Sequence, residues 1–357
     1  MPGRRGATDH ADRADRRTED ALRGADLTPE GAPRRTREVS IAFQSDKRPE
    51  EYVELARLAE RGGFDVVSVY HDLLFQPAIY PLLLMAQATE RVQLGPAALN
   101  PFTLHPVEIA GQIAALDAVS DGRAYLGLVR GSWLDTLGIE PRRPLTALRE
   151  AVEVIRRLLA GDASGFAGER FALAPGARLH YEPVRPDVPL MIGTWGVRVA
   201  AYAGQVAQEL KVGGTANPDL VPVMRSRIGN DLVRIVVGAV TVVDEDAAAA
   251  RRLAREEAAL YFPVLAGRDP TLEVPAGLAE DVRQLVGAGD REAAGRLIPD
   301  ELLDRLAFAG TPEQVTRQAA AVYEAGADRI EFGTPHGLTA RGGVELLATR
   351  VLPALGL

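Results

Sequence analysis

Short apolar segments alternate with amphipathic segments along most of the chain, and this alternation limits the fold more than any other feature. Apolar and β-branched runs predict strands, and apolar residues at three- and four-residue spacing predict helices. Strands that alternate with helices pair in parallel through right-handed crossovers. The strands are expected at 39–43, 66–70, 92–99, 124–129, 190–192, 209–212, 235–243 and 329–332. Eight such units close a TIM (β/α)8 barrel.

The segments between these strands predict the helices that would surround the barrel. They are expected at 49–61, 81–89, 106–120, 144–159, 197–203, 218–228, 246–265, 311–325 and 343–352. The turn after the first strand, QSDKRP, lacks the glycines that are typical of a doubly wound dinucleotide-binding sheet. The fold class predicted here is therefore α/β, as a closed barrel.

Two stretches interrupt the alternation. Residues 160–189 are rich in Gly and Pro and are consistent with a small hairpin, and residues 267–308 contain helical segments at 278–286 and 299–308. Long insertions after barrel strands commonly form lids over the site. We therefore expect a barrel with insertions.

Residues 1–37 differ in composition from the rest of the chain. They mix Arg, Asp, Glu, Gly and Pro and contain few large apolar side chains. Such a segment cannot bury enough surface to offset its ordering entropy. It is predicted to be a disordered tail, with an arm that folds on a partner as the alternative, and residues 38–357 are predicted to be the barrel domain.

Composition excludes several classes of protein. The net charge of −8 does not provide the basic surface that nucleic-acid binding requires. No cysteine is present, which excludes disulfides, thiolate nucleophiles and iron–sulfur clusters, and no spacing of His and carboxylate predicts a metal site. No apolar run has the length of a membrane span or a signal peptide. We expect a cytoplasmic protein that acts on a small molecule, not on nucleic acid or a membrane.

A TIM barrel places its active site at the carboxyl ends of the strands, which selects candidate site residues directly. The residues after the predicted strands include Gln44, Ser45, Tyr70, His71, Asp72, Leu99, Asn100, Arg130, Gly131, Ser132, Trp133, Gly193, Thr194, Trp195, Gly196, Gly213, Gly214, Thr215, Gly333, Thr334, Pro335 and His336. The catalytic and binding groups are expected among them.

Each candidate also has a purely structural interpretation. The turn 193–196 joins a strand to a helix and could hold a phosphate on backbone N–H groups, or it could be an ordinary connection. The pair His71 and Asp72 could transfer protons, or it could cap a helix. His336 lies in a glycine-flanked turn suited to close ligand approach, and the two tryptophans could enclose a flat ligand or pack in the core.

The segment 92–131 carries a resemblance to a known family. It reads VQLGPAALNPFTLHPVEIAGQIAALDAVSDGRAYLGLVRG. This is similar to the third and fourth units of the luciferase-like superfamily: a strand with L-G-x-x-x-x-N-P, then H-P, then L-D-x-x-S-x-G-R, then L-G-x-x-x-G. The segments AGQVAQELKVGGTANP and GADRIEFGTPHG extend the resemblance toward the C-terminus. Within the superfamily the chain most resembles the coenzyme F420-dependent methylenetetrahydromethanopterin reductases.

The resemblance implies that a deazaflavin or flavin lies across the barrel mouth. It implies a non-prolyl cis peptide between Ala97 and Ala98 behind the ring, and contacts of Leu99 and Asn100 with the ring. It also implies that the turn 193–196 binds the cofactor phosphate. The remaining cofactor-binding candidates are Arg130, Gly131, Ser132 and Lys211, the last as a charge near the phosphate or the acidic chain of the coenzyme.

The sequence also departs from the family pattern. Sugar-phosphate dehydrogenases of the superfamily carry Asp-His after the second strand, whereas this chain has His71 followed by Asp72. Their proton-donating Glu after the fourth strand corresponds to Ser132 here. We therefore do not expect sugar-phosphate dehydrogenase activity, and the proton is expected from Asp72, Glu108, His336 or water.

The predicted function is F420-dependent hydride transfer to or from a small organic substrate, at a C=N or C=C bond. The first alternative is a monooxygenase of the same family that uses reduced FMN, and the second is a flavin-binding protein without turnover. The resemblance also implies a homodimer. In either enzyme the cofactor supplies the chemistry and the protein supplies binding and electrostatics.

Overall fold

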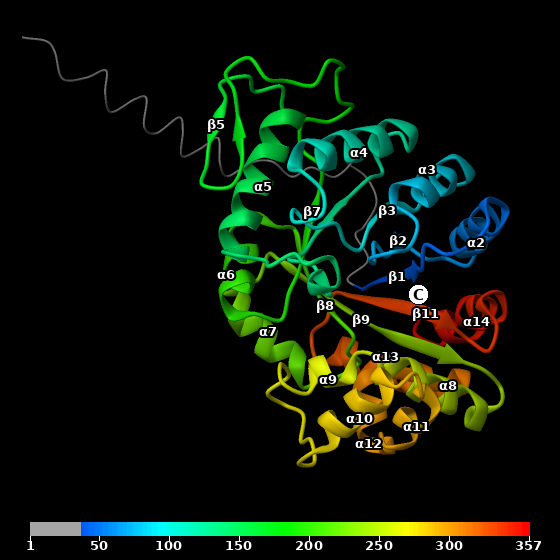
Figure 1. The fold of residues 1–357 in the computed structure, drawn as a ribbon. Coiled ribbons are helices and arrows are strands. Elements are labelled where there is room, and N and C mark those ends of the chain that lie inside the picture. Colours follow the sequence, from blue (N-terminus) through cyan, green and yellow to red (C-terminus); the bar gives the residue numbers. More distant parts are fainter. Residues whose placement is uncertain (1–36) are drawn as a thin grey trace, which may run out of the picture. The chain divides into compact units, whose positions relative to one another are not determined.

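The computed structural model describes residues 37–357, so the predicted tail lies outside the described residues except for Arg37. Within this range, parallel strands surround a common axis (Figure 1). They are β1 (Glu38–Phe43), β2 (Val66–Val69), β3 (Gln93–Pro96), β4 (Leu126–Leu128), β7 (Leu190–Gly193), β8 (Glu209–Gly213), β9 (Arg234–Val243) and β11 (Arg329–His336). All eight predicted barrel strands are confirmed.

The strand order shows how the barrel closes. Neighbouring strands follow the order β3-β2-β1-β11-β9-β8-β7-β4. Parallel bridges between Leu94 and Ala124, and between Leu99 and Leu128, then join the β3 end of this order to the β4 end. The site is therefore expected on the face where Phe43, Val69 and the other strand ends meet.

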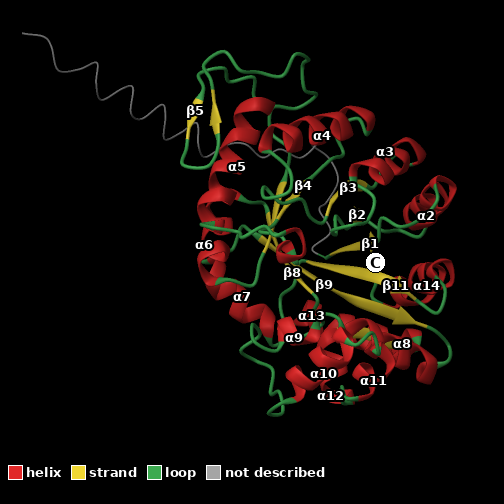
Figure 2. Cartoon of the chain, viewed as in Figure 1, coloured by secondary structure: helices red, strands yellow, loops and turns green. Residues whose placement is uncertain are grey.

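Helices cover the outside of the strands (Figure 2). They include α2 (Pro49–Arg61), α3 (Ile79–Ala88), α4 (Pro106–Val119), α5 (Pro144–Leu159), α6 (Val197–Val206), α7 (Leu220–Ile228), α8 (Ala247–Ala259), α13 (Pro312–Glu324) and α14 (Ala340–Leu346). Proline at the first position begins several of them, because its missing N–H needs no partner there. The predicted helix 343–352 begins earlier, at Ala340, and continues through η2 (Leu347–Val351) into α15 (Leu352–Ala354). No helix among residues 37–357 is long and apolar enough to cross a membrane.

The first insertion contains the predicted hairpin, formed by β5 (Phe166–Ala167) and β6 (Ala172–Leu173). A short 3-10 helix, η1 (Leu134–Leu137), follows β4 before α5 begins.

The second insertion contains α9 (Phe262–Leu265), α10 (Leu278–Gly287), α11 (Arg291–Arg296) and α12 (Asp300–Leu306), and two predictions there need correction. The predicted helix 246–265 is interrupted between α8 and α9, because Pro263 in the first turn of α9 has no N–H with which to continue the backbone ladder of α8. The predicted helix 299–308 ends at Leu306. Residues Ala307–Gly310 instead form β10, whose small and apolar side chains are buried against β9.

Apolar side chains form separate cores. The main core lies between barrel and helices, and a second core joins the insertion to the end of β9 through Val240, Val242 and Phe262. Inside the barrel, Val66, Tyr125, Met191 and Val236 form a smaller cluster. The insertion is therefore packed onto the barrel by apolar contacts as well as by strand pairing.

Candidate functional site

The segment after β3, which contains Ala97 and Ala98, lies at the barrel mouth and has an unusual backbone conformation. The peptide bond between Ala97 and Ala98 is cis, as the resemblance implied. The N–H of Ala97 donates to Val69 O at 2.8 Å, and the N–H of Leu99 donates to Gly127 O at 3.0 Å. Both alanines are only half-buried, with small side chains. This segment can therefore accept the face of a flat ring.

The two residues after the cis peptide, Leu99 and Asn100, both make contacts within the protein. The Leu99 side chain is buried in the main core, beside Ile113 of α4, so it does not face the mouth. The Oδ1 atom of Asn100 accepts from the backbone N–H groups of Phe102 and Thr103, both at 3.0 Å. The Leu99 side chain is therefore placed in the core, Asn100 stabilises the loop that carries it, and contact of these two residues with the ring remains a prediction.

The segment after β4 supplies exposed polar groups at the mouth. Gly131 has a φ of 93°, and a Cβ there would lie 3.0 Å from the Asn100 side chain. Glycine is required because an L side chain would be strained in this conformation and crowded. The side chains of Arg130 and Ser132 on either side are exposed. They remain candidates for cofactor contacts.

The turn 193–196 leads directly from β7 into α6. Gly196 is the N-cap of α6, no side chain among the described residues caps this end, and no acidic residue lies in its first turn. A Cβ on Gly196 would meet nothing closer than Thr194 Oγ1 at 3.7 Å, so the turn faces open space. The indole N–H of Trp195 donates to Gly213 O at 3.1 Å, which fixes the turn against β8. An uncapped helix N-terminus of this kind favours an anion.

Lys211 is engaged inside the barrel. Its ammonium group is paired with Glu331 and lies 5.2 Å from the centre of the Tyr70 ring. Glu331 also accepts a hydrogen bond from Ser68 Oγ at 2.7 Å, and Ser68 is bonded to the Tyr125 hydroxyl at 2.8 Å. Buried charges of this kind require partners. This pairing argues against the predicted role of Lys211 at the cofactor phosphate.

The sequence analysis missed this polar network. Its only signal was the presence of Ser68 and Glu331 inside otherwise apolar strand segments. In a strand, alternate residues face opposite sides, so such polar residues indicate which positions face the interior.

His71 and Asp72 take different partners. The Nδ1 atom of His71 accepts from the Ala78 N–H at 3.2 Å, and burial lowers the pKa of His71 although the charge of Asp72 opposes this. The Asp72 carboxylate accepts from Gln44 Nε2 at 2.8 Å. Burial, with the charge of Asp72 adding to it, raises the pKa of Tyr261 to about 12. Asp72 is therefore oriented by Gln44 and lies near Tyr261, while His71 holds the loop.

The structure does not support proton transfer at His336. The side chain is fully buried, its Nε2 is 3.0 Å from Ala42 O, and its ring centre lies 5.1 Å from that of Phe43. Burial lowers the pKa of His336 to about 3, so the imidazole is neutral and shielded. Glu108, in contrast, is exposed in the first turn of α4, and its role remains a prediction.

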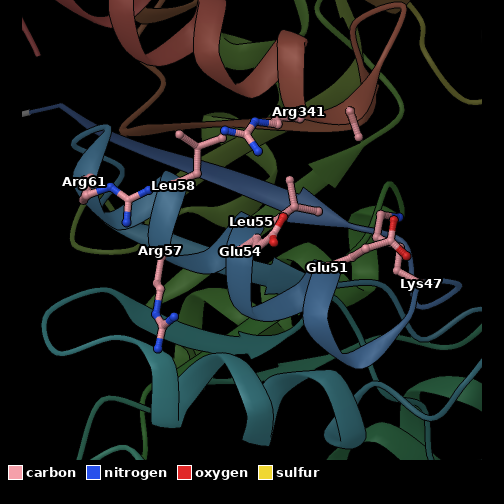
Figure 3. Close-up of a pocket in the computed structure, with 9 residues that line it drawn as sticks. Lys47, Glu51, Glu54, Leu55, Arg57, Leu58, Arg61 and Arg341 are labelled. Carbon is pink, nitrogen blue, oxygen red and sulfur yellow. The ribbon is translucent and has the colours of Figure 1, made fainter.

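A groove of about 520 Å³ lies outside the barrel, between α2 and the start of α14 (Figure 3). It is lined by basic and acidic side chains, among them Arg57, Arg61, Arg341, Glu51 and Glu54. None of the sequence-predicted site residues lines this groove. The mouth of the barrel therefore remains the candidate site.

The geometry thus defines a TIM-barrel protein with an uncapped helix N-terminus and two small, half-buried alanines at its mouth. Residues 26–329 match the family model described as luciferase-like monooxygenase. The match covers most of the chain, so the protein belongs to the luciferase-like monooxygenase family.

Relatives of known name agree with this assignment. The chain is 28% identical to a 5,10-methylenetetrahydromethanopterin reductase of Archaeoglobus fulgidus, over 88% of this chain and 98% of the relative. It is 28% identical to an F420-dependent glucose-6-phosphate dehydrogenase of Rhodococcus erythropolis, over 86% and 94% of the two chains. The solved structure of the F420-dependent tetrahydromethanopterin reductase of Methanopyrus kandleri superposes with a TM-score of 0.81 at 24% identity, covering 89% of this chain and 99% of that one. The last comparison supports the fold.

Proposed function

We propose that the protein is a coenzyme F420-dependent oxidoreductase that acts on a small organic substrate, at a C=N or C=C bond. The observation that carries the proposal is the uncapped N-terminus of α6 behind the open turn 193–196. The names of the relatives, a methylenetetrahydromethanopterin reductase and an F420-dependent dehydrogenase, give the cofactor and the reaction class.

The residues at the mouth fit this coenzyme. The first-turn N–H groups of α6 would hold its phosphate, because no described side chain caps this end of the helix. The half-buried Ala97 and Ala98 would lie against the ring, since their small side chains leave room for it. The segment Arg130 to Ser132 would border the ring on the side of β4.

When bound, the reduced deazaflavin supplies a hydride from C5, and the protein must orient the substrate and manage one proton. Asp72 is the best-placed group for the proton, because Gln44 fixes its carboxylate. The nearby phenol of Tyr261, whose pKa burial raises to about 12, is protonated at neutral pH like any tyrosine and would donate a hydrogen bond to the substrate. Both residues lie half-buried at the mouth.

A fluorescence titration tests the proposal. Oxidised F420 and FMN are each added to the purified protein, and binding is followed by quenching of cofactor fluorescence. We expect F420 to bind at least about tenfold more tightly, a difference of about 1.4 kcal/mol. Equal or reversed affinities would overturn the F420 assignment in favour of an FMN-dependent monooxygenase. Tight binding without hydride transfer to any acceptor would support the non-catalytic alternative.

We also propose that the protein is a homodimer in the cytoplasm, as the family resemblance implies. Sedimentation velocity at micromolar concentration measures the association state directly. A single monomeric species would contradict the dimer.

A further inference from the structure

Two loops from distant parts of the chain meet at the barrel mouth. Trp133 follows β4, and Tyr261 lies between α8 and α9. Their ring centres are 6.0 Å apart, with the ring planes inclined by 56°. This contact brings the segment after β4 beside the beginning of the second insertion. Side chains close to the two rings are therefore candidates for a shared binding site.

Each of these loops carries an arginine without a carboxylate partner. Arg130 lies three residues before Trp133, and Arg268 lies in the turn after α9. Within residues 37–357, neither guanidinium group forms an ion pair. Several arginines of the neighbouring helices do form ion pairs: Arg251 binds Asp300 and Asp304, and Arg305 binds Asp219. The chain has 49 acidic against 41 basic residues, so carboxylates are not scarce.

The two charges also affect each other. Although the Arg130 side chain is largely exposed, partial burial of its guanidinium group lowers the pKa of Arg130, and the charge of Arg268 lowers it further, with no carboxylate acting in the opposite direction. Two like charges held near one another disfavour their own charged states. An anion between them would remove this cost and would gain two charge-assisted contacts.

The turn that carries Arg268 is fixed in place. The N–H of Arg268 donates to Leu265 O at 2.8 Å. The neighbouring Asp269 is buried, and its carboxylate accepts from Asn217 Nδ2 at 3.0 Å and from the Thr271 N–H at 2.8 Å. Asn217 belongs to the loop after β8, so its hydrogen bond to Asp269 holds the turn that carries Arg268 against the barrel. A guanidinium group on an anchored turn loses less freedom when it binds a ligand.

We propose that Arg130 and Arg268 form a second anion-binding site at the mouth, for a carboxylate or phosphate group of a ligand bound across the barrel. Paired guanidinium groups suit both anions, because each presents planar, forked donors. The proposal rests on the proposed function and adds a substrate or coenzyme subsite to it. The anion belongs either to the acidic chain of the coenzyme beyond its phosphate or to the substrate.

Binding measurements with three probes separate these sources. The probes are intact F420, a deazaflavin truncated before the phosphate and acidic chain, and inorganic phosphate added to the F420-loaded protein. The variants are Arg130→Gln and Arg268→Gln, which keep hydrogen-bonding capacity and remove the charge. Arg341→Gln, on α14 at the outer groove, is the matched control. Thermal melting of each variant verifies folding, and Arg268→Lys tests whether positive charge alone restores binding.

If the coenzyme supplies the anion, both variants weaken binding of intact F420 by about tenfold to a hundredfold and leave the truncated deazaflavin unchanged. If the substrate supplies it, F420 binds as in the wild type, and phosphate binding to the loaded protein is weakened by a similar factor. Either pattern supports the site. Wild-type affinity of both variants for F420 and for phosphate would overturn it, as would an equal loss for intact and truncated deazaflavin. Failure of the wild-type protein to bind F420 would instead refute the proposed function.

Discussion

Two glycine-flanked turns of similar sequence lie at strand ends of the same barrel, and they have opposite environments. The turn 193–196 reads GTWG, and a Cβ on Gly196 would enter open space. The segment 333–337, which comprises the end of β11 and the residue after it, reads GTPHG, and a Cβ on Gly337 would lie 2.7 Å from Gly343 Cα and 2.9 Å from Val243 O. Glycine in the first turn leaves room for a ligand, whereas glycine in the second allows backbone segments to pack. Similar composition therefore does not imply a similar function.

The largest expected effect is a loss of turnover when the carboxylate proposed to transfer the proton is removed. If the chemistry lies at the open mouth, Asp72→Ala should lower turnover by about 10²–10⁴-fold while F420 affinity stays near that of the wild type. Turnover is measured as the rate at which substrate reoxidises the bound, reduced deazaflavin. His71→Ala is the neighbouring control and should mainly lower the melting temperature, because its ring holds Ala78. Normal turnover in Asp72→Ala would remove this residue from the mechanism.

The second prediction tests the packed turn. Gly337→Ala should lower the free energy of unfolding by about 2–3 kcal/mol, because the added methyl group overlaps backbone atoms that cannot move easily. Gly196→Ala is the matched substitution in the open turn and should change stability little. Urea denaturation of both variants measures the difference. Equal stability of the two would show that the turns do not differ in packing.

The third prediction tests the open turn as a ligand site. Gly196→Val places a branched side chain where the cofactor phosphate is proposed to bind, so F420 affinity should fall by about 1–3 kcal/mol. The fold should be retained, because nothing lies within 3.7 Å of the new Cβ. Fluorescence titration and thermal melting of the same sample separate the two effects. Unchanged affinity would place the phosphate elsewhere.

The smallest expected effect is a pH dependence of stability that originates at His336. Its pKa is about 3 in the folded protein, below the ordinary value of 6.5, so below pH 6.5 the unfolded chain binds a proton that the folded chain does not. The contribution is complete above pH 6.5 and is lost as the pH falls toward 3. At pH 5.5 the loss should be about 1.3 kcal/mol relative to pH 7. His336→Gln lacks this group, and an identical pH profile for the variant would show that His336 is accessible after all.

The sequence predicted the barrel well because each strand–helix unit carries its own local pattern. The start of α2 at Pro49 and the uncapped turn before α6 could be identified from neighbouring residues alone. Contacts between segments that are distant in sequence could not be predicted in this way. Glu331 is separated from Lys211 by a long stretch of sequence, and the inward direction of both side chains depends on barrel closure. The burial of His336 against Phe43 likewise requires β11 to pair with β1.

The second insertion also contains features that could not be predicted from neighbouring residues. Residues 307 and 308 were predicted as the end of a helix, because no local signal reveals that β9 extends far enough to pair with the strand that begins there. Arg268 was not a candidate, since its loop has no strand immediately before it. Its significance depends on the contact between Trp133 and Tyr261.

The ion pair between Lys211 and Glu331 determines how the protein should respond to dissolved salt. Both side chains are almost completely inaccessible to water, so ions in solution cannot come between them. Exposed pairs such as Arg142 with Glu140 are screened over a Debye length of about 8 Å at physiological ionic strength. A rise in ionic strength should therefore weaken the electrostatics of the surface and mouth while the polar centre of the barrel keeps its geometry.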